Sequence, residues 1–144
     1  MSAHEERLYF LLQIAAHRLR TEADNALVSA AGLTTAQVAA LNLIAASSHV
    51  KQRDLAKRLK QNDSAITAMV ARLMKADLVS RERSESDART WLLKLTENGK
   101  KTLKRVHKPF ADINARLDKA VGKKNAAALA EQLEAIANAF SKSD

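Results

Sequence analysis

The chain has 144 residues, 47% hydrophobic and 28% charged, a composition typical of one globular domain rather than of a disordered segment. Three glycines and one proline leave little material for a turn-rich all-β fold, and the lack of cysteine excludes disulfides, thiolate metal sites and thiol-based redox sensing. No apolar run approaches the roughly 18 residues that cross a bilayer, and the first residues lack a signal peptide's basic start and apolar core, so we expect a cytoplasmic protein without a membrane partner.

The first third of the chain has the hydrophobic spacing of two helices. Apolar residues recur every three or four positions over 8–27, which predicts a long first helix that ends near Gly32. The segment Thr34–Gln37 reads Thr-Thr-Ala-Gln, which is typical of a capping box. A second helix is therefore predicted from this box to about Ala46.

Two further helices are predicted after a short loop at 47–51. The third helix is short and runs from about Gln52 to Leu59. Asn62 is a good N-terminal cap for a fourth helix that reaches about Lys75. The apolar face of this fourth helix is formed by Ile66, Met69, Val70 and Leu73.

Two short runs with β-strand character come next, over about 78–83 and 90–95. The second run alternates as a half-buried strand does, with Trp91, Leu93 and Leu95 on one face. A polar loop without glycine or proline joins the two runs, so we predict a β-hairpin with a stiff, charged tip.

The rest of the chain is predicted to be helical. Thr96 is a cap for a fifth helix, and Pro109 falls within its pattern, so we expect a kink or break near His107. A sixth helix is predicted over 123–140. The fold is thus mainly α with a small β-hairpin wing, and a tight turn between the third and fourth helices makes it a winged helix-turn-helix, a DNA-reading unit.

The net charge of +8 is concentrated in the centre of the chain. Residues 51–105 hold 15 Lys and Arg against 7 Asp and Glu, whereas the remaining residues hold 9 of each. Positive charge that served only solubility would be spread evenly along the chain. Its concentration in the centre therefore indicates a binding surface for a polyanion. The neutral ends carry amphipathic helices that could either form an intrachain core or bury each other across a two-fold axis. Their aromatic residues are Tyr9, Phe10, Phe110 and Phe140.

The outward face of the fourth helix is the first candidate site. Short side chains let a helix backbone enter a major groove, Ser and Thr can bond base edges or phosphates, and alanine methyl groups suit a thymine methyl. An ordinary amphipathic helix with a small exposed face is the alternative, and the helix-turn-helix context favours DNA. This face comprises Ser64, Thr67, Ala68, Ala71, Arg72 and Lys75.

The loop between the two strands is the second candidate site. Arg83 and Arg89 at its tip could reach the flanking DNA backbone or a narrow minor groove, whose negative potential attracts arginine. Asp87 is predicted to fix the guanidinium of Arg89 as a charged partner. The alternative is a surface ion pair worth at most about 1 kcal/mol and without a function. The full predicted DNA-binding set is Arg53, Ser64, Ala65, Thr67, Ala68, Arg72, Lys75, Arg83, Asp87 and Arg89.

Other kinds of chemistry have no signature in the chain. The four histidines, His4, His17, His49 and His107, are scattered, and no two share a helical turn as metal ligands often do. A Gly-rich phosphate loop and a nucleophile motif are also absent. We therefore expect no metal, no cofactor and no enzymatic activity.

Three segments together resemble the MarR family of transcription regulators. Residues 87–99, DARTWLLKLTENG, are similar to the family's wing signature, D-x-R…L-T-x-x-G. Residues 33–41 and 52–81 resemble its second, third and fourth helices in order. The resemblance covers the whole chain and implies a single domain over 1–144.

The resemblance implies an architecture and roles. It places a winged helix-turn-helix lobe at about 33–100 and dimerisation helices at about 1–30 and 101–144, in a homodimer that binds a pseudo-palindromic operator. By this similarity Arg89 is the wing arginine and Asp87 its orienting partner. Many relatives carry arginine or another polar residue where this chain has Ala68, which shifts base reading toward Thr67, Arg72 and the wing.

A ligand response is also implied. Regulators resembling this family often bind small aromatic or phenolic anions between the dimerisation helices and the DNA-binding lobe, so the first two helices would line the pocket, with Gln13 and His17 as polar contacts. The predicted function is a nucleoid-associated, sequence-specific regulator of transcription, a repressor that such a ligand releases. The alternatives are a winged-helix module that docks on an acidic protein and a non-specific architectural DNA binder.

Overall fold

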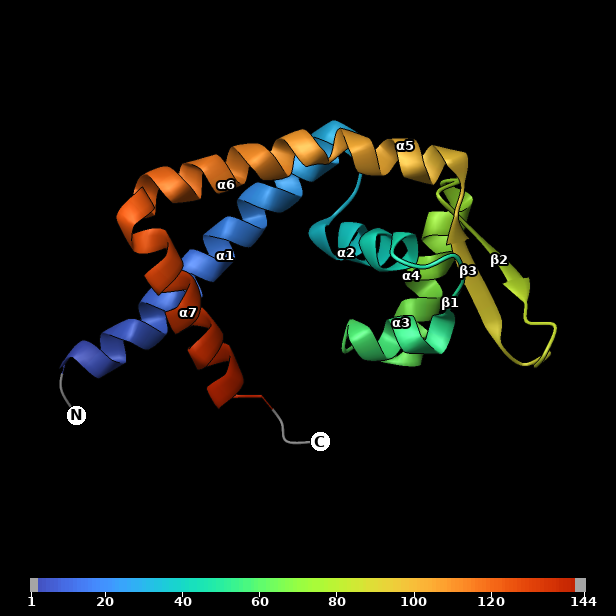
Figure 1. Cartoon of the computed structure of the whole chain (residues 1–144), viewed down its shortest axis with the longest axis horizontal. Helices are drawn as coiled ribbons and strands as arrows, with labels where there is room; N and C mark the ends of the chain where they lie inside the picture. Colours follow the sequence, from blue (N-terminus) through green and yellow to red (C-terminus); the bar gives the residue numbers. More distant parts are fainter. Residues whose placement is uncertain (1–2, 142–144) are drawn as a thin grey trace. The chain divides into compact units, whose positions relative to one another are not determined.

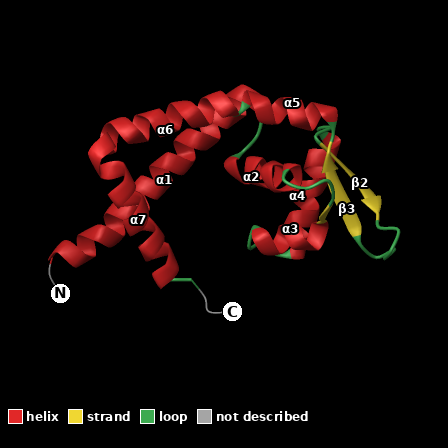
Figure 2. Ribbon diagram, in the orientation of Figure 1, coloured by secondary structure: helices red, strands yellow, loops and turns green. Residues whose placement is uncertain are grey.

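The computed structural model describes residues 3–141 of the chain (Figure 1). The outermost positions of the predicted dimerisation segments, 1–2 and 142–144, lie outside the described residues, as does the side chain of His4. The elements are α1 (Ala3–Ala31), α2 (Thr35–Ala45), β1 (Val50–Lys51), α3 (Gln52–Arg58), α4 (Asp63–Lys75), β2 (Val79–Arg83), β3 (Trp91–Leu95), α5 (Glu97–Arg105), α6 (His107–Val121) and α7 (Lys123–Ala139). The prediction of a mainly helical fold with a small β wing is confirmed (Figure 2).

The chain divides into two compact units, residues 1–109 and 110–144. The first unit contains α1 to α5 and the sheet, and its core is built from side chains of every one of these helices. Leu27, Leu41, Leu55, Ile66 and Leu93 are among the fully buried side chains of this core. The second unit contains α7 and most of α6, and neither helix buries a residue completely.

The first two helices end and begin where the sequence indicates. α1 stops at Ala31, and Gly32 follows with a φ of 68°, a left-handed conformation that favours glycine. The capping box of α2 is confirmed, since the Thr34 hydroxyl oxygen accepts from the Gln37 backbone nitrogen while the Gln37 side chain accepts from the Thr34 nitrogen. Asp24 of α1 also accepts hydrogen bonds from the Thr35 backbone nitrogen at 2.7 Å and hydroxyl at 2.8 Å, which ties α1 to α2.

The helix-turn-helix consists of α3 and α4. The turn between them passes through Lys60 with a φ of 53°, and the side chain of Asn62 caps α4 by accepting from the Ala65 nitrogen at 2.8 Å. The predicted apolar face of α4 is confirmed as the buried one. The opposite face of α4 is consequently left exposed.

The wing is a three-stranded antiparallel sheet with the order β1-β3-β2, rather than the predicted two-stranded hairpin. The hairpin register pairs Val79 with Leu95 and Arg83 with Trp91. The third strand is Val50–Lys51, which was predicted to be loop. Its partners are Leu93 and Leu92, more than 40 residues away in the sequence, and two residues are too few to show strand periodicity.

The base of the wing is fixed to the start of α5. The predicted cap is confirmed, since the Thr96 hydroxyl oxygen accepts from the Gly99 nitrogen at 2.9 Å, and the same hydroxyl donates to the Asp77 carbonyl at 2.6 Å. At Gly99 any Cβ would overlap the Leu78 carbonyl oxygen, so only glycine allows α5 to approach the segment just before β2 this closely.

The predicted break near His107 is confirmed. α5 ends at Arg105, Val106 forms its C-terminal cap, and α6 begins at His107 with Pro109 in its first turn, where a missing N–H costs no helical hydrogen bond.

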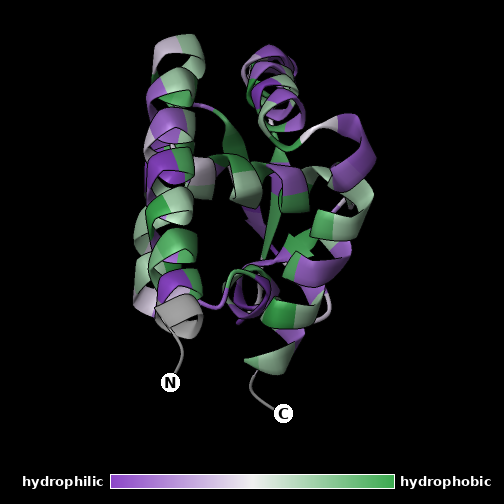
Figure 3. Cartoon of the chain, turned by 90° about the vertical axis from the view of Figure 1, so that its left-hand side faces the viewer, coloured by the Kyte–Doolittle hydropathy of each residue, from purple (hydrophilic) through white to green (hydrophobic). Residues whose placement is uncertain are grey.

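The apolar stripe of α1 is buried only at its C-terminal end. Ala23 and Leu27 are buried, whereas Tyr9 is 62% and Leu11 50% exposed. Figure 3 shows hydrophobic residues recurring along this helix from the end marked N. On α7, Leu129, Leu133 and Ile136 are also exposed. Within the described residues, these apolar side chains of α1 and α7 are therefore exposed.

Among residues 3–141, no single helix has the length and apolarity to cross a membrane. The bent pair Arg7–Ala31 and Thr35–Ala45 meets that test only when its two helices are taken together, by length and composition.

Candidate nucleic-acid interface

The exposed face of α4 carries the side chains that the sequence predicts there. Ser64, Ala65, Thr67, Ala68, Ala71, Arg72 and Lys75 are all exposed. The side chains near the N-terminal end of α4 are short, and the two cations lie in the last turn. A face of this shape fits a major groove, because the backbone can approach the bases before long side chains contact the phosphates.

The hydroxyl of Thr67 already has two hydrogen bonds. It donates to the Asp63 carbonyl at 2.8 Å and accepts from the amide nitrogen of Gln52 at 3.3 Å. The Ser64 hydroxyl likewise donates to the side chain of Asn62. The bond from Gln52 connects α3 with α4, and the three bonds together hold both hydroxyls in position.

Asp87 holds the backbone of the wing loop. Its carboxylate accepts from the backbone nitrogen of Arg89 at 3.0 Å and from the hydroxyl of Thr90 at 2.9 Å. The prediction that Asp87 fixes the Arg89 guanidinium is therefore wrong for this structure, because the contact is made to the main chain. A carboxylate two residues before an arginine reaches the amide with less chain distortion than the distant guanidinium.

The charge of Asp87 is stabilised by these contacts. The Arg89 amide and then the Thr90 hydroxyl hold the pKa of the Asp87 carboxyl below its usual value, and the positive charges of Arg53 and Lys51 act in the same direction. These contacts favour the ionised form of Asp87, whose carboxylate accepts both hydrogen bonds.

The Arg83 side chain packs against the hairpin that carries it. Its guanidinium carbon lies 4.2 Å from the centroid of the Trp91 ring, and the group also donates a hydrogen bond to the Ala88 carbonyl. Arg81 lies over the same indole, also at 4.2 Å. The expectation that Arg83 reaches outward from the tip is thus not met in this structure, because cation–π attraction and a backbone acceptor hold its charged group against the hairpin.

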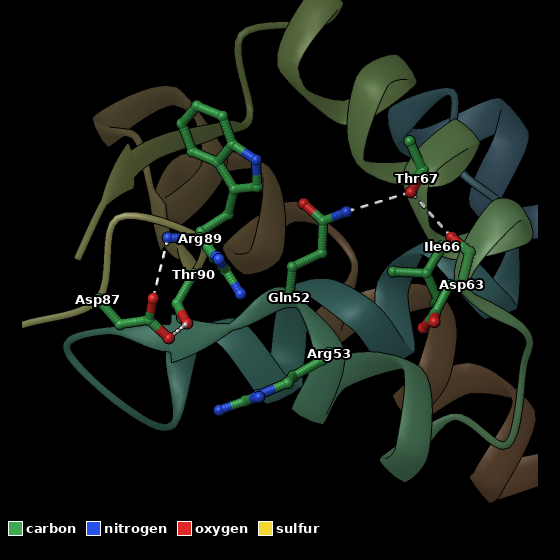
Figure 4. A pocket seen from close by; sticks show the side chains of 9 residues that line it. Gln52, Arg53, Asp63, Ile66, Thr67, Asp87, Arg89 and Thr90 are labelled. Atoms are coloured by element: carbon green, nitrogen blue, oxygen red, sulfur yellow. Dashed lines mark hydrogen bonds between the residues drawn. The ribbon is translucent and has the colours of Figure 1, made fainter.

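A single cleft brings α3, α4 and the wing together. Its volume is about 420 Å³ (Figure 4). Figure 4 shows Gln52 between Thr67 on one side and the wing residues Arg89 and Thr90 on the other. Four residues of the predicted set, Arg53, Thr67, Asp87 and Arg89, meet here, although they are separated by up to 36 positions in the sequence. The cleft is lined by Gln52, Arg53, Asp63, Ile66, Thr67, Asp87, Arg89, Thr90 and Trp91.

Two residues of this region were missed by the sequence analysis. Gln52 links the two helices of the motif, and its side-chain oxygen is buried without a hydrogen-bond partner among the described residues. Arg81 packs on Trp91. The contact of Arg81 with Trp91 could have been predicted from the strand pattern, because Arg81 and Arg83 are two residues apart on one strand and therefore share a face. No local signal identifies Gln52.

The predicted effector contacts lie on α1, outside the cleft between α3, α4 and the wing. Gln13 and His17, with Ile14 and Arg18, line an open hollow of about 490 Å³. All four residues belong to α1, and α2 contributes nothing to the hollow. Among the described residues, no group of three or more His, Asp or Glu side chains is placed to hold a metal ion.

Comparison with known proteins gives a consistent result. A family model described as the MarR family matches residues 31–90. The chain is 32% identical over 95 residues to the organic hydroperoxide resistance transcriptional regulator of Bacillus subtilis (strain 168). This alignment covers 66% of the chain and 64% of that regulator, just under two thirds of its length.

Solved structures extend the similarity over almost the entire chain. A transcriptional repressor, CouR, bound to a 23-mer DNA duplex is 33% identical, with a TM-score of 0.85 over 95% of this chain and 96% of that one. Sco3205, a MarR family regulator from Streptomyces coelicolor solved in complex with DNA, is 26% identical, with a TM-score of 0.88 over 99% and 95% of the two chains.

Proposed function

Since the chain belongs to the MarR family of winged helix-turn-helix transcriptional regulators, we propose that it binds a specific, pseudo-palindromic operator in double-stranded DNA as a homodimer and represses transcription. The family is one of regulators rather than of enzymes. The observation that carries the proposal is the cleft, in which the exposed face of α4 and the wing arginine open onto the same space. Two of the similar proteins described above hold DNA in their solved structures.

In this proposal α4 enters the major groove. Thr67 and Arg72 read base edges, since the Thr67 oxygen keeps one lone pair that can accept from a base amino group and an arginine can make a bidentate contact with guanine. Lys75 and Arg53 bind phosphates, which fix the register on the duplex without reading sequence. The remaining contacts are small side chains that permit close approach, namely Ser64, Ala65 and Ala68.

Arg89 acts in the wing, where its exposed guanidinium enters the flanking minor groove. Asp87 contributes by fixing the backbone that presents Arg89, and Arg83 contributes by stiffening the hairpin against Trp91. Holding the loop before binding reduces the conformational entropy lost when the complex forms.

The dimer uses the exposed apolar faces of the terminal segments, at about 1–30 and 101–144. Exposed apolar side chains concentrated on α1 and α7 are typical of obligate interfaces, which resemble a domain core cut in half. A two-fold dimer can place two recognition helices about 34 Å apart, one turn of DNA, and this spacing matches a pseudo-palindrome.

A small aromatic or phenolic anion releases the repressor. Gln13 and His17 are the proposed polar contacts, at the hollow on α1, which a second subunit would have to complete because one helix cannot enclose a ligand. A response through thiol oxidation is not proposed, because the chain contains no cysteine. We place the protein in the cytoplasm, on the nucleoid.

The test is a gel-shift titration of wild type and Arg89→Ala on an operator-like inverted repeat and on a random duplex, each at two salt concentrations. Wild type should prefer the inverted repeat, and log affinity should fall with log salt by roughly 0.9 per phosphate contacted. Arg89→Ala should bind the operator about tenfold more weakly, as expected when one charged groove contact is lost.

The other outcomes separate the alternatives. Equal retardation of both duplexes would indicate a non-specific architectural protein. Absence of any retardation, at either salt concentration, would favour a protein-interaction module. Equal operator affinity of wild type and Arg89→Ala would contradict the role given to the wing.

A further inference from the structure

A second concave surface lies at the other end of β3, where α2 ends and α5 begins. It is an open hollow of about 610 Å³ whose apolar lining comes from Ile44, Ala45, Ala46 and Leu95. The side chains of Lys94 and Lys100 line the same hollow. It shares no residue with the cleft between α4 and the wing.

Two lysines line this hollow, and further lysines follow on α5. Lys100, Lys101 and Lys104 are exposed on α5, and Lys104 lies four residues after Lys100 and three after Lys101, so it is a neighbour of both on the helix surface. Lys94 is also exposed and is directly paired in the sheet with an uncharged residue, Ser80. We refer to Lys94 at the end of β3, together with Lys100, Lys101 and Lys104 of α5, as the α5 rim.

Glu97 shows how a carboxylate behaves at this rim. Its carboxylate accepts from the Lys100 ammonium at 3.0 Å. This hydrogen bond and the charge of Lys100 lower the pKa of Glu97, and the charges of Lys101 and Lys104 add to the effect. One carboxylate against four ammonium groups leaves the rim with unbalanced positive charge.

The interior of the hollow differs from its rim. α2 ends at Ala45, and the partial negative charge of a helix C-terminus disfavours an anion placed beside it. The apolar lining is likewise suited to a hydrocarbon group rather than to a phosphate or carboxylate. The complementary ligand therefore has an apolar group at its centre and negative charges around it.

This pattern discriminates between classes of partner. Double-stranded DNA presents phosphates to a basic surface but no exposed apolar side group that would fill such a hollow. An acidic peptide segment with leucine or phenylalanine residues presents both features, as in other helix-in-groove and acidic-motif complexes. The open form of the hollow also suits a peptide lying across the surface.

We propose that the hollow and the α5 rim form a docking site for an acidic peptide segment of another protein, with a leucine or phenylalanine side chain in the hollow and Asp or Glu side chains on the rim. Figure 1 shows β3 leading from the wing loop to α5, so the two ends of this strand serve different surfaces. Arg89 and Lys94 are five residues apart, about 16 Å along an extended chain. The recognition face and the docking site can therefore be occupied together.

The experiment measures fluorescence anisotropy of a labelled, short peptide of alternating glutamate and leucine, added to the full-length protein at physiological ionic strength. A second probe has serine in place of every leucine and keeps the same charge. Wild type should bind the leucine probe at least about tenfold more tightly than the serine probe, because burying even one leucine contributes that much affinity.

Two variants locate the site. Lys94→Glu combined with Lys101→Glu should weaken binding of the leucine probe about tenfold or more, as two rim contacts become repulsive. Ala45→Gln should weaken it without a change of charge, because a longer polar side chain enters the hollow. The matched control is Lys119→Glu combined with Lys124→Glu, which makes the same change in net charge at exposed residues outside the hollow and should leave probe binding unchanged.

Operator binding is measured in parallel on the same proteins, and thermal unfolding verifies that each variant is folded. Retained operator binding by the Lys94→Glu/Lys101→Glu protein, with loss of the leucine probe, supports a separate docking site. Equal binding of the two probes, or an equal effect of the rim and control variants, would show charge attraction alone and overturn the proposal. So would loss of probe binding in Arg89→Ala, which would place the peptide on the DNA-binding face, or failure of wild type to bind the leucine probe.

Discussion

At the scale of single residues, the wing depends on side chains that act on the backbone. Asp87 closes the loop by accepting from the Arg89 amide and the Thr90 hydroxyl, and Thr90 is only 8% exposed. Arg83 donates to the Ala88 carbonyl from the other side. The charged residues of the loop thus have distinct tasks, since Asp87 and Arg83 stiffen the structure that presents Arg89.

Replacement of Asp87 tests this division. Asp87→Ala removes both acceptors and should weaken operator binding about tenfold, through loss of loop order rather than of a DNA contact. Asp87→Asn keeps one acceptor oxygen and should lose less. Fluorescence anisotropy with labelled operator measures both affinities, and a larger loss for Asn than for Ala would argue against the acceptor role.

Asp24 predicts how stability depends on pH. Hydrogen bonds from the Thr35 amide and hydroxyl lower its pKa, and nearby Arg20 adds to the effect. A carboxyl whose pKa is lower in the folded state stabilises the fold above the pKa of the unfolded chain, and this contribution disappears as pH falls through the folded-state value. The relevant window therefore lies below about pH 4.

Urea unfolding of wild type and Asp24→Asn over a pH series provides the measurement, at one protein concentration because dimerisation affects stability. Asparagine does not titrate, so wild type should be the more stable protein near neutral pH, and the difference should shrink below about pH 4. A difference that stays constant down to strongly acidic pH would exclude Asp24 as its source.

At the scale of elements, the position of α5 decides where the wing is held. The start of α5 meets the residues just before β2, because the Thr96 hydroxyl donates to the Asp77 carbonyl and Gly99 lies against the Leu78 carbonyl. The same helix then passes through Val106 into α6. One glycine thus sets the distance between the DNA-binding lobe's sheet and the helix that leaves it.

Gly99→Ala should destabilise the protein by about 2 kcal/mol, because the added methyl group forces a backbone shift of the kind seen on overpacking a core. Lys101→Ala, an exposed position on the same helix, is the matched control and should change the free energy of unfolding by less than about 0.5 kcal/mol. Chemical denaturation measures both, and equal stability of the two variants would mean that α5 can move away from Leu78 without loss.

At the scale of the whole molecule, charge and apolar surface are separated along the chain. The excess of positive charge lies within residues 51–105, and the exposed apolar side chains lie on α1 and α7. This separation suits a protein whose centre binds polyanions and whose ends bind a second copy of itself.

Leu11→Glu should convert the dimer to monomer, since it places a charge in the proposed apolar interface at a residue that is 50% exposed in the single chain. Ser29→Glu adds the same charge at an exposed polar position of α1 and should leave the dimer intact. Sedimentation equilibrium distinguishes the two states. A Leu11→Glu protein that remains dimeric would place the interface elsewhere, and a wild-type monomer would contradict the dimer altogether.

The sequence by itself determined the helices, their caps, the break before Pro109 and the exposed face of α4. These features depend on neighbours within four residues, such as the Thr34 and Asn62 caps, or on the spacing of apolar side chains along one helix. The central concentration of charge was equally visible, because it needs no coordinates.

Only the tertiary structure decided which distant residues meet. The pairing of Val50 with Leu93 added a third strand, and the register of the hairpin placed Arg83 on Trp91. The link from Gln52 to Thr67 and the hollow between α2, β3 and α5 likewise join segments far apart in the sequence. Such contacts leave no periodic signal, since they form through the packing of one element against another rather than through preferences within either.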